Sequence, residues 1–197
     1  MSTEERKSTD RGFSPEEMKR IMKVGAVLAI SAVVFMLGLG LLIHQNIIGL
    51  HPASTREETL KGFAPRVEYA LRYQSLLVFW LTFNVVATIY GRLTTNALNP
   101  LDERTEHRVQ MFKNVLTNSF ESVVVSVFSQ LIFVSFAEPL TVLKFIPFIN
   151  IVQFIGRVSF FAGYPMYRAF GFQCTILPNI CLSFYNLFKL GSFMGFY

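Results

Sequence analysis

Five stretches of the chain are rich in apolar residues and poor in charged ones. The first, residues 24–43, is a run of twenty residues without a charged side chain. Because an α-helix rises ~1.5 Å per residue, such a run is long enough to span the ~30 Å hydrocarbon core of a bilayer. The other four stretches cover residues 74–90, 115–137, 145–164 and 172–190. This pattern predicts an all-α, multi-pass membrane helix bundle with five transmembrane helices.

The more polar segments divide the chain around these helices. We expect a cytosolic N-terminal segment, a first transmembrane helix, an outer loop and a four-helix transmembrane core over residues 1–23, 24–43, 44–65 and 66–197 respectively. Residues 14–17, Ser-Pro-Glu-Glu, have the N-cap serine, N1 proline and N3 glutamate that begin a helix. The first helix is therefore expected to begin in water, near Pro15. A cleaved signal peptide is the alternative, but its apolar region would be only about 7–15 residues long.

The composition excludes a soluble globular domain. Hydrophobic residues make up 52% of the 197 residues and charged residues only 16%, against about 25% charged in an average soluble domain. Lys and Arg also indicate an orientation, because short cytosolic loops are enriched in them. The segments predicted inside carry eleven and those predicted outside carry six, which favours a cytosolic N-terminus. These loops explain the net charge of +5, and no motif of a nucleic-acid-binding protein accompanies it.

The lengths of the apolar stretches bear on location. Spans of 17 and 20 residues lie in the lower half of the usual range for transmembrane helices. Internal membranes are slightly thinner than the plasma membrane. We therefore expect an integral protein of the endomembrane system, in the Golgi, lysosome or ER, with the plasma membrane as the alternative.

Two charged residues, Glu121 and Arg157, lie inside apolar stretches, where a charge normally faces a partner or a cavity. Counted from the inner ends of their helices, both lie roughly 9–10 Å deep. On consecutive antiparallel helices, this common depth predicts an intramembrane ion pair between Glu121 and Arg157. Asn114 and Asn118 share the helix face of Glu121 by their spacing. The pair either holds two helices in register or belongs to an anionic-ligand site, with Arg157 as the carboxylate-binding fork.

The sequence contains no pattern typical of a catalytic or metal site, and we expect neither. The three histidines lie near loops and lack the i, i+4 spacing of helical metal ligands. Nucleophile motifs and phosphate-binding glycine loops are also missing from the sequence. Ser122, Ser126 and Ser129 form a small polar stripe, which we interpret as a surface for close helix packing rather than catalysis.

Several motifs within residues 66–190 occur in the order and spacing of a known family. Residues 118–121 form Asn-x-x-Glu, and Arg157 is followed by Gly163-Tyr164. On these residues the chain resembles the membrane-associated eicosanoid and glutathione metabolism superfamily. Further motifs are similar to a member with an extra N-terminal span: Arg66-Val67-x-Tyr69-x-Leu71-Arg72, Leu143-Lys144-x-x-Pro147 and Arg168-x-Phe170-Gly171-Phe172. The resemblance implies a four-helix membrane core that assembles as a homotrimer, preceded here by one more transmembrane helix.

The candidate site residues form an intramembrane cluster that is either structural or ligand-binding: Asn114, Asn118, Glu121, Arg157, Tyr164 and Arg168. Glutathione-using members carry Arg at the position of Asn114 and often Tyr at the position of Phe160. The loss of these contacts predicts a non-catalytic protein without a cofactor, whose partners are membrane lipids or other membrane proteins. The alternative is a membrane transferase or peroxidase that uses glutathione. A channel or transporter is disfavoured, because the buried charges are few and can pair.

Overall fold

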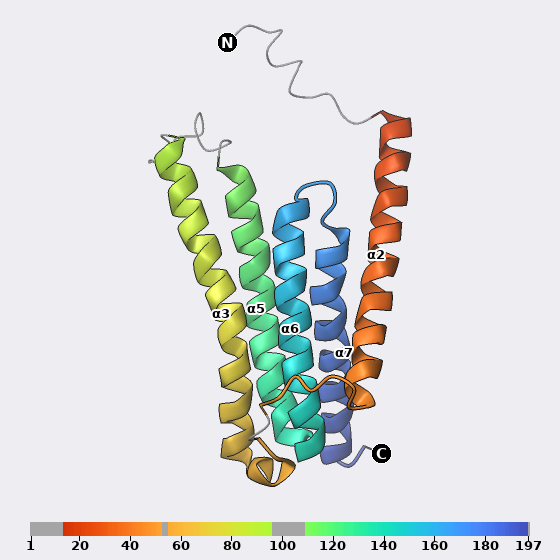
Figure 1. Cartoon of the computed structure of the whole chain (residues 1–197), viewed down its shortest axis with the longest axis vertical. Coiled ribbons are helices and arrows are strands. Elements are labelled where there is room, and N and C mark those ends of the chain that lie inside the picture. Colours follow the sequence, from red (N-terminus) through yellow and green to blue (C-terminus); the bar gives the residue numbers. More distant parts are fainter. Residues whose placement is uncertain (1–13, 53–54, 96–108, 197) are drawn as a thin grey trace, which may run out of the picture.

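The computed structural model describes residues 14–52, 55–95 and 109–196. Within these ranges the chain forms five α-helices and one short 3-10 helix, and no strand. In chain order the elements are α2 (Pro15–His44), η1 (Glu57–Leu60), α3 (Phe63–Thr94), α5 (Gln110–Phe136), α6 (Pro139–Gly163) and α7 (Ala169–Phe193) (Figure 1). The prediction of an all-α fold is confirmed.

Four of the helices, α2, α3, α5 and α6, are long and apolar enough to cross a membrane. The chain is therefore an integral, multi-pass membrane protein. The fifth helix, α7, has 25 residues, but Gln173, Asn179 and Asn186 lower its hydropathy. That α7 also crosses the bilayer stays a prediction.

The beginning of α2 is determined by its local sequence. The hydroxyl of Ser14 accepts a hydrogen bond from the backbone N–H of Glu17 at 3.2 Å, and the Glu17 carboxylate accepts one from the backbone N–H of Ser14 at 2.9 Å. This capping box satisfies backbone donors that the first turn of a helix leaves unpaired. Pro15 occupies the first helical position, so the predicted start of this helix is confirmed.

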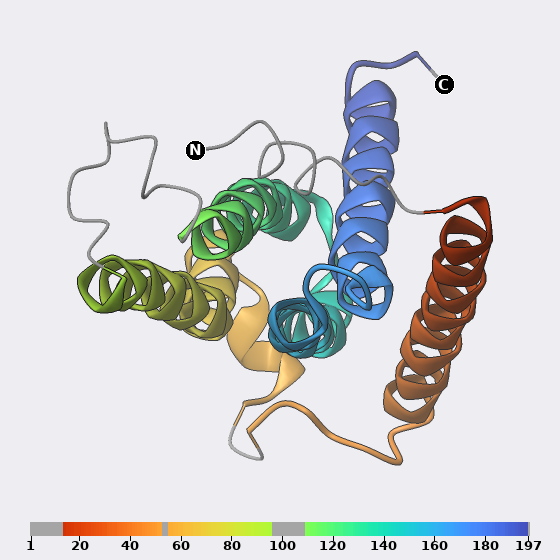
Figure 2. The same cartoon turned by 90° about the horizontal axis from the view of Figure 1, so that it is seen from above.

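The helices α3, α5, α6 and α7 form a group that we call the four-helix core. Figure 2 shows these four together and α2 standing to one side, where it packs mainly against α7 and less against α6. We call the end of the bundle at which α2 begins the inner end, after the predicted orientation, and the end at which α2 finishes the outer end. The inner end holds the turn between α6 and α7 (Figure 1).

Pro147 lies inside α6 without ending the helix. Because proline has no N–H, the carbonyl of Leu143, four residues earlier, lacks its normal helical partner. The hydroxyl of Tyr69, in α3, donates to that carbonyl at 3.1 Å. A neighbouring helix thus satisfies the backbone group that the proline leaves free.

The helices α6 and α7 approach each other most closely at a pair of glycines. A Cβ atom added to Gly171 would overlap the carbonyl oxygen of Gly156, and one added to Gly156 would lie 2.7 Å from the Cβ of Cys174. Small residues allow this kind of close backbone contact between membrane helices. The contact sets the spacing of α6 and α7 near their inner ends, beside the candidate site.

Candidate functional site

Arg157 is the buried charge at the centre of the candidate site. It lies six residues before α6 ends at Gly163, which corresponds to roughly 9 Å along the helix, and its residue is only 3% exposed. Nη1 donates to the side-chain oxygen of Asn118 at 2.6 Å, and Nη2 donates to the hydroxyl of Thr175 at 2.8 Å. The guanidinium therefore joins α6 to both α5 and α7.

The predicted ion pair between Glu121 and Arg157 is wrong. Glu121 is exposed on α5, and the only ion pair between described residues joins Arg72 to Glu68. An equal depth brings two residues to the same level of a bundle but does not decide the direction in which each points. Glu121 lies two positions after the buried Ser119, and two positions correspond to a rotation of ~200° around a helix. Its carboxylate therefore lies away from the core.

The ring of Phe160 lies between two guanidinium groups. The Cζ atom of Arg157 is 5.6 Å from the ring centre, and that of Arg168 is 5.9 Å from it. Arg168 also stands 5.4 Å from the ring centre of Tyr164, whose hydroxyl accepts a hydrogen bond from Asn114 at 2.9 Å. These cation–π contacts hold Arg168 close to a second positive charge. The structure thus brings together every candidate site residue except the glutamate.

A cavity of about 530 Å³ lies beside this cluster, between the inner half of α2 and the turn that joins α6 to α7. Ile21 and Gly25 of α2 line one side, and Phe172 of α7 contributes to the other. Its polar lining includes the side chains of Asn118 and Arg168. Arg157 stands behind Asn118, to which it donates its hydrogen bond. The cavity combines an apolar wall with a positively charged one.

The electrostatics of the site favour an anion. In the described part of the chain neither Arg157 nor Arg168 forms an ion pair, and the Nε atom of Arg157 has no hydrogen-bond partner. An arginine side chain stays protonated, and a charge buried in a membrane protein normally faces an opposite charge, a cavity or polar groups. A carboxylate or phosphate bound at the Asn118–Arg168 wall would supply the missing negative charge.

Buried polar side chains continue from the site into the middle of the bundle. Gln153 accepts a hydrogen bond from Ser126 and donates one to Asn179, both at 2.6 Å. Gln130 donates to Ser126 at 2.8 Å and accepts from Asn150 at 2.7 Å. We call these five residues the polar network. It connects α5, α6 and α7 by hydrogen bonds between neutral groups.

Neither the polar network nor the contact of Thr175 with Arg157 was predicted from the sequence. The serines of α5 were interpreted only as a packing surface. The available signal was a shared spacing: Asn150, Gln153 and Arg157 are three and four positions apart and lie along one stripe of α6. Thr175 and Asn179 are likewise four apart on α7. A polar stripe on each of three neighbouring apolar helices indicates a common polar interior.

Comparison of the chain with known protein families, curated proteins and solved structures finds no match. The resemblance to a glutathione-metabolising superfamily therefore rests on the sequence motifs. The chemistry of the site follows from its geometry: two guanidinium groups, an amide and aromatic rings, beside a partly apolar cavity.

Proposed function

We propose that this chain is a non-catalytic membrane protein, similar to mattrin (transmembrane protein 79), that binds an anionic lipid at its inner end. The observation that carries the proposal is the buried guanidinium of Arg157, which has no carboxylate partner among the described residues and stands next to a cavity that Arg168 lines. The lipid headgroup contacts Arg168 and Asn118, and Arg157 adds positive potential from behind. An acyl chain covers the apolar wall formed by Ile21 and Phe172.

The residues around the cavity support binding rather than catalysis. Within the described part of the chain, its lining contains amide, guanidinium, thioether and apolar groups, but no carboxylate, thiol or imidazole. The nearby hydroxyl of Tyr164 is engaged by Asn114, and that of Thr175 by Arg157. Phe160 occupies the position at which the resemblance implies a tyrosine in catalytic members.

The proposed partner, a second copy of the chain, is supported by the resemblance to mattrin and by the exposed charge of Glu121. Mattrin has one span before its four-helix core, which corresponds to α2 before the core here. Glu121 is exposed on an apolar helix, where contact with lipid chains would be costly. We propose that a second copy of the chain covers this face in a homotrimer, in an endomembrane such as the Golgi or lysosome.

The main test is lipid retention by the full-length chain, purified in detergent and measured by native mass spectrometry. Phosphatidylserine should be retained in preference to phosphatidylcholine. Arg168→Gln should weaken this retention about tenfold, because it removes a charge-assisted hydrogen bond to the headgroup. Arg72→Gln, a surface change at the outer end of α3, is the matched control. Equal retention of both lipids, or no effect of Arg168→Gln, would contradict the proposal.

The alternative function, a glutathione-dependent transferase or peroxidase, is favoured by the contact between Arg157 and Asn118, two residues that the resemblance assigns to glutathione binding. It is tested by calorimetry with millimolar glutathione and by conjugation and peroxidase assays. Glutathione turnover that disappears in Arg157→Ala would establish the enzyme and overturn the non-catalytic proposal. Absence of glutathione binding would exclude the enzyme.

A further inference from the structure

Two adjoining cavities lie beside the outer half of α2, where it borders α6 and α7. The deeper one has a volume of about 470 Å³ and the one nearer the outer end about 370 Å³. They share Gly40, Phe145 and Phe148 as lining residues and therefore adjoin each other. We call the two cavities together the outer groove. Both volumes fall within the about 300–1,000 Å³ that is usual for ligand pockets.

The deeper part of the outer groove is almost wholly apolar. Met36 and Leu37 line it from α2, Phe148 from α6, and Leu177 and Cys181 from α7. The side chains of Leu37 and Cys181 are exposed, so this part is open at the side of the bundle. At that level of an apolar helix the surroundings are lipid chains.

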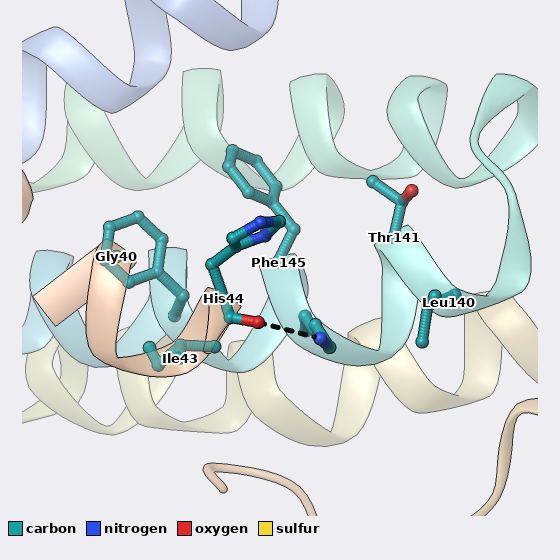
Figure 3. Close-up of a pocket in the computed structure, with 8 residues that line it drawn as sticks. Gly40, Ile43, His44, Leu140, Thr141 and Phe145 are labelled. Atoms are coloured by element: carbon teal, nitrogen blue, oxygen red, sulfur yellow. Dashed lines mark hydrogen bonds between the residues drawn. The ribbon is translucent and has the colours of Figure 1, made fainter. Parts of the chain in front are cut away.

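The outer end of the groove carries a positive charge. Lys144, in α6, lines it together with His44, the last residue of α2, and its ammonium donates to the backbone carbonyl of His44 at 3.3 Å. Figure 3 shows His44, Phe145 and Thr141 around this end of the groove, and its dashed line marks that hydrogen bond. A lysine ammonium has three donors, so two more are available to a ligand.

The positive charge of Lys144 at the outer end of the groove is not balanced by a neighbouring acidic residue of the described chain. Among the residues that the structure describes, no acidic one lines either part of the groove, and Lys144 forms no ion pair with any of them. Both Lys144 and His44 lie near the outer ends of helices that are apolar along most of their length. This is the level at which phospholipid phosphates lie in a bilayer.

We infer that the outer groove binds one anionic phospholipid. One acyl chain lies between α2 and the α6–α7 pair, along Phe148, Met36 and Leu177, and the phosphate accepts hydrogen bonds from Lys144. Water is a poor occupant of the deeper part of the groove, because it would find no polar partners there. An empty apolar cavity would lose dispersion contacts, which an acyl chain provides. The outer groove and the inner cavity border opposite ends of α2, so this inference does not rest on the proposed function.

The native Cys181 provides a direct reporter of occupancy, because its side chain lines the groove. The full-length chain, purified in detergent, is reacted with N-ethylmaleimide with and without added phosphatidylglycerol, and lipid retention is measured in parallel by native mass spectrometry. Phosphatidylglycerol should slow the alkylation of Cys181, and an Arg168→Gln chain, whose inner cavity is weakened, should retain one molecule of it. Phosphatidylcholine should protect Cys181 less, and inorganic phosphate should not protect it.

Two variants separate the headgroup contact from the chain contact. In an Arg168→Gln chain, where the inner cavity contributes little, Lys144→Gln should reduce phosphatidylglycerol retention about fivefold, which corresponds to the loss of one lysine charge near a headgroup. Lys61→Gln is the matched control, because Lys61 is an exposed lysine that also lies at the outer end of the bundle. Cys181→Phe should reduce retention by filling the groove while Lys144 is kept. Arg168→Gln, at the inner cavity, should leave the protection of Cys181 unchanged.

Three results would overturn the inference. The first is that phosphatidylglycerol fails to protect Cys181. The second is that Lys144→Gln and Cys181→Phe both bind phosphatidylglycerol as the native chain does while their melting temperatures are unchanged. The third is that Cys181 is already protected without lipid in a particle with more than one copy of the chain, since a second copy would then occupy the groove.

Discussion

The helix α7 has a different kind of neighbour on each side. Toward α6, Gly171 and Gly156 bring the two backbones so close that an added Cβ would overlap a carbonyl oxygen. Toward α2, the contact is formed by packed side chains: Ala32 packs with Cys174, and the ring centres of Phe35 and Phe170 lie 5.9 Å apart. Only Ala32 and Ile43 of the thirty residues of α2 are buried.

This contrast shows what holds membrane helices together. In a bilayer, apolar side chains gain little by leaving lipid, so close backbone packing and hydrogen bonds decide which helices associate. The pair α6 and α7 has both, through its glycines and through Gln153 and Asn179. The helix α2 contributes mainly apolar side chains, with one hydrogen bond from Lys144 to the carbonyl of His44 at its outer end, and cavities remain between it and the core at both of its ends.

The largest expected effect on stability comes from Gly171→Ala, which tests the close backbone contact between α6 and α7. The new Cβ cannot be accommodated without moving a backbone, and we expect a loss of about 3 kcal/mol in the free energy of unfolding. Thermal unfolding in detergent, followed by size-exclusion chromatography, measures it. The matched control is Gly38→Ala in α2, where open space and better helix propensity predict a small gain in stability. Equal effects of the two substitutions would contradict the close backbone contact between Gly171 and Gly156.

The next effect is expected from Gln130→Leu in the polar network. This change leaves the amide of Asn150 and the hydroxyl of Ser126 with fewer partners, and should cost about 2 kcal/mol. Thr82→Val, on the exposed side of α3, should change stability by less than about 0.5 kcal/mol. The double variant Gln130→Leu/Asn150→Leu should recover part of the loss, and strictly additive losses would show that the two side chains do not interact.

A smaller effect is expected from Tyr69→Phe, at the outer end of the core. It removes the donor to the Leu143 carbonyl that Pro147 leaves free, which should cost about 1 kcal/mol. Tyr167→Phe, an exposed tyrosine beside α2, should have no measurable effect on the melting temperature. A Tyr69→Phe variant as stable as the native chain would mean that the proline is tolerated without this hydrogen bond.

The smallest effect on stability should come from modifying Cys181. Both cysteines are free, but Cys174 is buried between α6 and α2 whereas Cys181 is exposed. In the delipidated native protein, N-ethylmaleimide should therefore add one label, at Cys181, with little change in melting temperature. A second label should appear only after denaturation. Peptide mass spectrometry identifies the site, and labelling of Cys174 in the folded chain would show that α2 detaches from the core.

Local patterns were sufficient to predict the class of protein and several of its elements. The uncharged run of residues 24–43 indicated a membrane helix, and residues 14–17 indicated where that helix begins, because a capping box involves only neighbours along the chain. The contact of Gly156 with Gly171 on the next helix was not predicted.

The candidate site was predicted only in part, because position along a helix is easier to infer than direction around it. Counting residues placed Arg157 and Glu121 at a common depth, yet the structure directs Arg157 to Asn118 and Thr175 and leaves Glu121 exposed. The relevant rotation depends on which face of α5 is buried against its neighbours. In a membrane helix the faces toward lipid and toward protein are both largely apolar. The positions of the apolar residues therefore do not reveal which face is buried.

The sequence alone thus sufficed for the membrane class, the helical fold, the start of α2 and the presence of a buried arginine. Each of these depends on composition or on residues close together in the chain. The neighbours of that arginine, the polar network and the outer groove depend on how five helices are placed and rotated against one another. That arrangement is set by contacts between residues far apart in sequence, such as Gly156 with Gly171, so it became visible only in the folded molecule.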